Sequence, residues 1–150
     1  MKIAVRYQTI GGNTRLVADT IANVAGVKAE TIKTTIDEPV DILFIGGGVY
    51  AWTIARNLKK YLENLDPDKI RYVAAFTTGG LMGATGKICE IVKAKNIKYC
   101  EIKLPLKVFF KNYGGVTKNT VKLNENQILK VRNFAEKIIK SLAPKNEDKS

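Results

Sequence analysis

Histidine is absent from this 150-residue chain, and cysteine, proline and tryptophan are scarce. The lack of histidine removes the commonest general base and the commonest metal ligand. The two cysteines, Cys89 and Cys100, do not have the Cys-x-x-Cys spacing of a redox or zinc pair. We therefore predict no catalytic side chain and no metal site, so that any chemistry would belong to a bound cofactor.

Long apolar runs are also missing. The longest weakly polar stretch, residues 42–55, is too short and too rich in glycine to cross a bilayer. The chain enters a strand pattern directly after Met1, without a signal peptide, so we expect a cytoplasmic protein with no membrane partner. Length and a hydrophobic content of 45% predict one domain, residues 1–143, followed by a polar and disordered tail, residues 144–150.

Basic residues outnumber acidic ones by 25 to 14, which gives a net charge of +11. Such a charge admits nucleic acid or an acidic protein as a partner. No dense basic cluster is interleaved with aromatic residues, so we favour an ordinary lysine-rich surface and do not expect nucleic acid. The lysines lie on predicted polar helix faces: Lys59, Lys60, Lys93, Lys95, Lys137 and Lys140.

Strand-like runs alternate with helix-like apolar spacing along the chain. Strands are predicted at residues 2–7, 27–33, 41–45, 71–77 and 97–104, and helices at 14–25, after Thr53, around Ile88 and after Asn124. This alternation predicts a parallel sheet with helices on both faces. Thr53 is expected to cap its helix, and Asn124 with Gln127 has capping-box spacing. Arg6, inside the first strand, either reaches the rim of the next loop or pairs with an acid such as Asp41.

A glycine-rich turn follows the first predicted strand. Thr9 and Thr14 carry hydroxyl groups, and Asn13 carries an amide. The adjacent Gly11 and Gly12 let the backbone curl around an anion at the start of the helix, where negative charge is favoured. The turn has no lysine, unlike a nucleoside triphosphate loop. It is therefore either a site for one compact phosphate or an ordinary tight turn with a threonine cap.

Two further loops of small residues follow later strands. One contains Gly46, Gly47 and Gly48 ahead of Tyr50 and Trp52, and the other covers residues 78–83. In a parallel sheet all three loops emerge at the carboxyl edge, where open α/β sheets bind ligands. Together they predict a site for a flat, phosphorylated ligand.

These loops resemble those of a short-chain flavodoxin, and the resemblance covers residues 1–142. Thr9, Gly12 and Thr14 match the family's phosphate loop, Ser/Thr-x-Thr-Gly-x-Thr, and Gly11 replaces its middle threonine. The resemblance implies a doubly wound α/β fold whose five-stranded parallel sheet has the strand order 2-1-3-4-5.

The later loops match the family in part. Tyr50 stands where an aromatic residue of the family stacks on the flavin ring. Ala51 stands where the family usually has a glycine, whose carbonyl turns to accept the flavin N5–H on reduction. Leu81 and Met82 occupy the place of the usual second aromatic residue. The family is commonly acidic, whereas this chain is basic.

The resemblance implies noncovalent FMN and electron transfer to redox partner proteins, which the charge of this chain would make acidic. The alternatives are an FMN-dependent oxidoreductase acting on a quinone or similar small molecule, and a flavin-free flavodoxin-like binding domain. The implied cofactor-binding residues are Thr9, Ile10, Gly11, Gly12, Asn13, Thr14, Gly47, Gly48, Val49, Tyr50, Ala51, Trp52, Thr77, Thr78, Gly79, Gly80 and Leu81.

Overall fold

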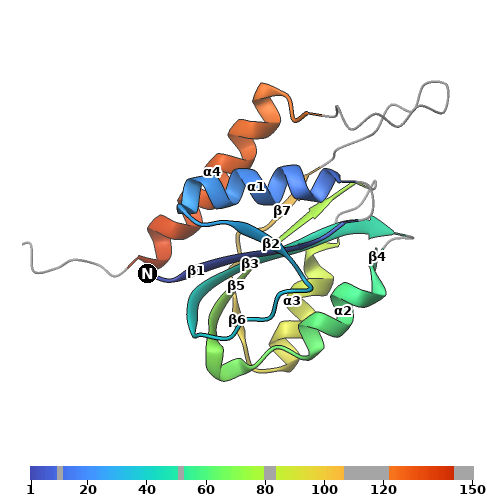
Figure 1. The fold of residues 1–150 in the computed structure, drawn as a ribbon, viewed down its shortest axis with the longest axis vertical. Helices are drawn as coiled ribbons and strands as arrows, with labels where there is room; N and C mark the ends of the chain where they lie inside the picture. Colours follow the sequence, from blue (N-terminus) through green and yellow to red (C-terminus); the bar gives the residue numbers. More distant parts are fainter. Residues whose placement is uncertain (10–11, 51–52, 80–83, 107–121, 144–150) are drawn as a thin grey trace, which may run out of the picture.

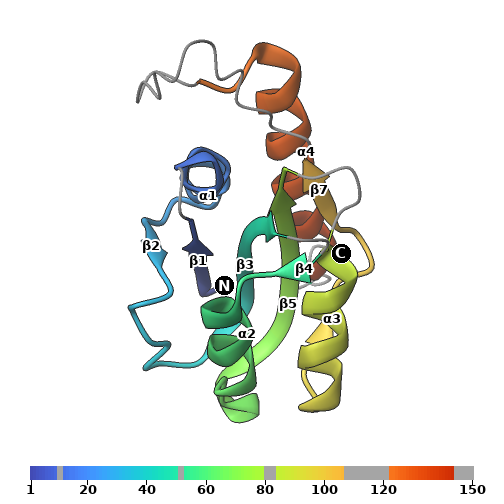
Figure 2. The same cartoon turned by 90° about the vertical axis from the view of Figure 1, so that its right-hand side faces the viewer.

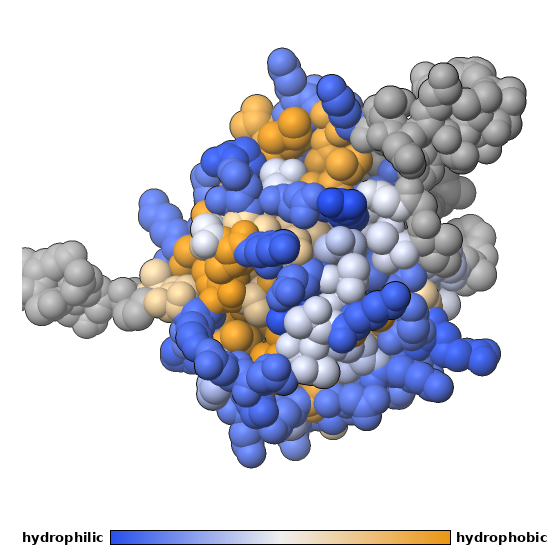
Figure 3. Space-filling model, viewed as in Figure 1, coloured by the Kyte–Doolittle hydropathy of each residue, from blue (hydrophilic) through white to orange (hydrophobic). Residues whose placement is uncertain are grey.

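A parallel β-sheet lies between two layers of helices (Figures 1 and 2). The computed structural model describes residues 1–9, 12–50, 53–79, 84–106 and 122–143. The predicted division of the chain at residue 143 stays a prediction, because residues 144–150 lie outside these ranges. Polar side chains cover most of the face in Figure 3, and apolar ones gather over part of α4 and near the start of β1.

The strand order is β2-β1-β3-β5-β6, and every pairing along it is parallel. This is the predicted order 2-1-3-4-5, which is thereby confirmed. In addition, β4 pairs antiparallel with β3, and β7 pairs parallel with β5. The strands are β1 (Ile3–Gln8), β2 (Ala29–Thr31), β3 (Val40–Tyr50), β4 (Thr53–Ile54), β5 (Ile70–Thr78), β6 (Lys98–Tyr99) and β7 (Leu104–Leu106).

The helices divide between the two faces of the sheet. They are α1 (Asn13–Ala25), α2 (Arg56–Glu63), α3 (Thr85–Ala94) and α4 (Glu125–Leu142), with a short 3-10 turn, η1 (Pro67–Lys69). In the part of the chain that the structure describes, no helix is both long and apolar enough to span a membrane. Helices α1 and α4 cover one face of the sheet, and α2 and α3 cover the other.

Each face has its own apolar core. Between the sheet and α1 with α4, the Phe44 and Phe134 rings meet edge to face at 5.9 Å. On the opposite face, Leu58 and Leu62 of α2 and Ile88 of α3 are fully buried against the sheet. The helical spacing of apolar residues predicted that these faces of α2 and α3 point inward, and the burial of Leu58, Leu62 and Ile88 confirms it.

The third strand is longer than predicted. It continues through the three glycines to Tyr50, so the prediction that a loop begins at Gly46 was wrong. Gly46 is required inside the strand, because a Cβ there would overlap the Phe76 carbonyl oxygen and lie 2.5 Å from the Phe76 ring. Pairing with β1 on one side and β5 on the other supplies the backbone hydrogen bonds that hold the glycines extended.

Two other predicted boundaries were also wrong. Thr53 does not cap α2, because it lies in β4 and Ala55 is the N-cap residue. The predicted fifth strand is instead two short strands, β6 and β7. Lys98 of β6 pairs near the start of β5, and Leu104 of β7 pairs near its end.

Candidate functional site

The start of α1 leaves its backbone donors without a side-chain cap. Gly12 is the N-cap residue with φ +91°, and its N–H donates to Thr9 Oγ1 at 2.8 Å. A Cβ at Gly12 would meet no atom within 4 Å, so the space beside it is open. No acidic residue lies in the first turn of α1. These features are those of an anion site at a helix N-terminus.

A buried hydrogen bond joins this helix start to the end of β5. The hydroxyl oxygens of Thr14 and Thr78 lie 2.8 Å apart, and the two residues are 1% and 3% exposed. Two of the three predicted loops are therefore tied together, although 64 positions separate these threonines. The direct contact of Thr14 with a phosphate stays a prediction.

The glycines of β3 make room for neighbouring side chains. Gly47 pairs with Gln8 of β1 and Thr77 of β5. A Cβ at Gly47 would lie 2.9 Å from Gln8 Oε1, so the Gln8 amide occupies the space that a larger residue would fill. Similarly, a Cβ at Gly48 would lie 2.7 Å from the hydroxyl oxygen of Tyr50. The Tyr50 ring therefore lies back along its own strand, and its predicted stacking on a ring ligand stays a prediction.

Three buried side-chain oxygens in the described residues have no hydrogen-bond partner: Gln8 Oε1, Asn13 Oδ1 and Thr77 Oγ1. Gln8 ends β1, Asn13 begins α1, and Thr77 is the last residue but one of β5. A buried polar atom left unpaired costs roughly 1–3 kcal/mol. The concentration of such atoms at this edge of the sheet indicates a place where a polar ligand completes the structure.

The adjacent strands β1, β3 and β5 bring the predicted site residues that the structure describes to one edge (Figure 1). Val49 lies in the part of β3 that pairs with β4, and the Gly79 N–H donates to the Leu106 carbonyl at 3.1 Å. The predicted residues that lie outside the described ranges are Ile10, Gly11, Ala51, Trp52, Gly80 and Leu81.

Sequence reasoning missed Gln8 and the tie between Thr14 and Thr78. A glutamine at the end of a mostly apolar strand, three residues before the first glycine of the turn, is the signal that could have identified Gln8. The Thr14–Thr78 hydrogen bond leaves no comparable signal in the sequence, because the two residues are close only in the folded chain.

The cysteines are poor candidates for thiol chemistry. Burial raises the pKa of the Cys100 thiol to about 11 and also raises the pKa of Cys89. Both groups are therefore protonated at neutral pH, whereas the reactive form is the thiolate. Within the described ranges, no three or more histidine, cysteine or acidic residues gather as a metal site would require.

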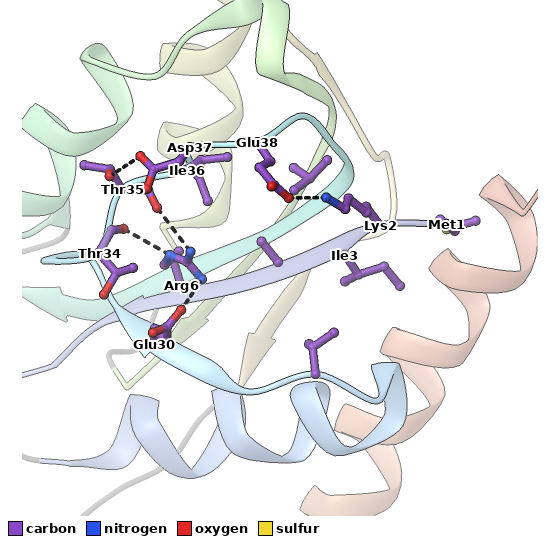
Figure 4. Close-up of a pocket in the computed structure, with 13 residues that line it drawn as sticks. Met1, Lys2, Ile3, Arg6, Glu30, Thr34, Thr35, Ile36, Asp37 and Glu38 are labelled. Carbon is purple, nitrogen blue, oxygen red and sulfur yellow. Dashed lines mark hydrogen bonds and ion pairs between the residues drawn. The ribbon is translucent and has the colours of Figure 1, made fainter.

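A separate cavity of about 600 Å³ borders the first half of β1 (Figure 4). Arg6 lies in it, is 8% exposed and donates to the carbonyl oxygens of Thr34 at 3.0 Å and Thr35 at 3.3 Å. Its ion pair is with Glu30 at 3.4 Å, so Arg6 does pair with an acid, as one of the two alternatives predicted, but the acid is Glu30 and not Asp41. Arg6 fixes the segment between β2 and β3 to the sheet.

No family model matches the chain, and no curated protein matches it. Several solved structures, however, match its fold. A flavodoxin from the domain Archaea is 17% identical, with a TM-score of 0.75 over 96% of this chain and 100% of that one. The fold is flavodoxin-like.

Two further structures agree with this assignment. Oxidised Flavodoxin 2 from Bacillus cereus is 18% identical, with a TM-score of 0.68 over 94% of this chain and 99% of that one. The rubredoxin oxygen:oxidoreductase of Desulfovibrio gigas has a TM-score of 0.65 and 17% identity, and the match spans 94% of this chain but 36% of that one. At these identities the similarity establishes the fold, and the ligand must be argued from the site.

Proposed function

We propose that this chain binds FMN noncovalently at the carboxyl edge of its sheet and acts as an electron-transfer protein with acidic redox partners. The observation that carries the proposal is the gathering of unpartnered buried oxygens around an uncapped helix start. The flavodoxin-like fold supports it, because proteins named flavodoxins share this architecture.

The residues at this edge fit a phosphorylated ring compound. The open space beside Gly12 and the free first turn of α1 suit a phosphate, which backbone N–H groups would bind without a lysine. Gln8 Oε1 is an acceptor, and the Thr77 hydroxyl is a donor as well as an acceptor, so both can pair with polar groups of the ligand or of its water. Bound FMN would supply the electron-carrying chemistry, and the protein would bind, orient and shield it.

The visible spectrum of the purified protein tests this proposal. We expect a yellow protein, or a colourless one that quenches the fluorescence of added FMN with a stoichiometry of one. We also expect the reduced protein to pass electrons to an acidic protein acceptor, at a rate that falls as salt screens the attraction. A colourless protein that leaves FMN fluorescence unchanged would reject FMN binding. Rapid reoxidation by a quinone, but by no protein acceptor, would instead favour an enzyme.

A further inference from the structure

All the contacts between cations and aromatic rings in the described ranges lie at one edge of the sheet. Arg71 and Lys98 each lie 5.7 Å from the centre of the Tyr72 ring, and Lys103 lies 5.7 Å from the centre of the Tyr99 ring. The pairing of β5 with β6 brings them together, because it sets Tyr72 beside Lys98. The β6 patch consists of Arg71, Tyr72, Lys93, Lys98, Tyr99 and Lys103.

Most of the positive charge of the β6 patch has no ion-pair partner in the described part of the chain, although Arg71 lies 4.0 Å from Asp41. Among the described residues, no carboxylate lies within 4.0 Å of Lys93, Lys98 or Lys103. Elsewhere, Lys87 pairs with Glu90 at 3.8 Å. The patch surrounds an open hollow of about 470 Å³, which Tyr72, Lys93, Asn96, Ile97, Lys98 and Tyr99 line together with one acidic residue, Glu101.

The backbone at this edge is open to a further strand. β6 is the last strand in the order of the sheet, so its outer side has no partner strand in the part of the chain described. An edge of this kind, here the two residues Lys98–Tyr99, can pair with an extended segment of another chain. A second copy of this edge is disfavoured, because it would set lysines against lysines.

The contacts between the cations and the tyrosine rings also favour a carboxylate-bearing segment over a nucleic acid. The cations already lie over the two tyrosine rings, so a nucleic-acid base would have to displace them in order to stack. Carboxylates need only approach the outward side of the cations. The same contacts restrain the long lysine side chains before binding, which lowers the entropy cost of an ion pair.

We propose that the β6 patch docks an extended acidic segment of a partner protein. Tyr72 lies six residues before Thr78 on β5, which corresponds to about 20 Å of strand. The docked segment therefore leaves the carboxyl edge of the sheet free. The proposal does not depend on FMN.

The probe for this proposal is a fluorescein-labelled peptide of alternating glutamate and valine, followed by fluorescence anisotropy at low salt. The triple variant Lys93→Gln, Lys98→Gln and Lys103→Gln should bind it about tenfold more weakly, since each exposed ion pair contributes roughly a factor of two to three. The control variant Lys60→Gln, Lys130→Gln and Lys137→Gln has the same net charge and exposed positions elsewhere. It should lose less than threefold.

Equal losses in the two triple variants would overturn the proposal, because net charge alone would then explain the binding. Tighter, patch-dependent binding of a single-stranded oligothymidine of equal charge would also overturn it and identify a nucleic-acid site. A Tyr72→Leu and Tyr99→Leu variant should weaken peptide binding about threefold, through loss of the restrained cations. FMN titration of each variant should match the wild type, so a failure here is distinct from a failure of FMN binding.

Discussion

Two helices of this molecule begin in opposite ways. At the start of α4, Asn124 Oδ1 accepts the Gln127 N–H at 2.8 Å, and Gln127 Oε1 accepts the Asn124 N–H at 2.9 Å. Glu125 adds a favourable negative charge to that first turn. At the start of α1, Gly12 provides no side-chain cap and the first turn contains no acidic residue. The start of α4 is capped within the chain, whereas the start of α1 has no side-chain cap, and we propose that a ligand binds there.

The other helices that follow the predicted ligand loops resemble α1. The N-cap residues of α2 and α3 are Ala55 and Ala84, neither of which has a side-chain cap, and neither first turn contains an acid. Only at α1 do a left-handed glycine and an unpartnered buried oxygen, that of Asn13, accompany the missing cap. We therefore compare α4, whose cap should stabilise the fold, with α1, whose uncapped backbone donors we propose as part of the ligand site.

Gly12→Val should have the largest effect. A β-branched residue is strained at φ +91° and fills the open space beside the helix start, so FMN binding should become undetectable. Gly26→Val is the matched control, because Gly26 ends the same helix and also has a positive φ, +72°. A Cβ at Gly26 would likewise meet no atom within 4 Å. Both variants should lose stability in thermal unfolding, but Gly26→Val should titrate with FMN as the wild type does. Equal FMN affinity in the two variants would remove α1 from the site.

Thr78→Val and Thr77→Val sharpen the comparison at the neighbouring strand end. Thr78→Val leaves the Thr14 hydroxyl buried and unpaired, so the free energy of unfolding should fall by about 1–3 kcal/mol. Thr77→Val removes a hydroxyl that has no partner, so it should raise the stability of the apoprotein by about 1 kcal/mol while weakening FMN binding. Urea unfolding of the apoproteins measures both. The same sign of change in the two variants would contradict the assignment of these hydroxyls.

Asn124→Ala removes the cap of α4. The loss should be about 1 kcal/mol, which for a domain of this size lowers the midpoint of thermal unfolding by roughly 2–4 °C. FMN affinity, measured by fluorescence quenching, should not change. A variant of normal stability would show that the capping box of α4 contributes little.

Arg15→Glu should have the smallest effect. It sets a negative charge near the first turn of α1, which suits the helix dipole but repels a phosphate, and it breaks the pair with Asp19 at 3.6 Å. We expect FMN to bind a few-fold more weakly and riboflavin to bind unchanged, since electrostatic effects of this kind are about 0.3–1 kcal/mol. Isothermal titration at low salt measures both ligands. An equal loss of riboflavin affinity would mean that residue 15 affects binding of the ring and not of the phosphate.

Local patterns in the sequence predicted much of this structure. The apolar periodicity placed the helices, and the spacing of Asn124 and Gln127 predicted the capping box that the structure confirms. The end of β3 was missed because glycines favour loops in isolation, whereas here strands on both sides and the Phe76 ring hold Gly46 extended. The Thr14–Thr78 bond and the Arg6 contacts depend on packing between distant segments, which no local pattern encodes.

The difference between the affinities of the wild-type protein for FMN and for riboflavin tests the central claim most directly. If the start of α1 binds the phosphate, several charge-assisted hydrogen bonds of roughly 1.5–3 kcal/mol each should make FMN bind at least about a hundredfold more tightly. Equal affinities for the two compounds would show that no phosphate binds at Gly12 and the first turn of α1, and would contradict this account.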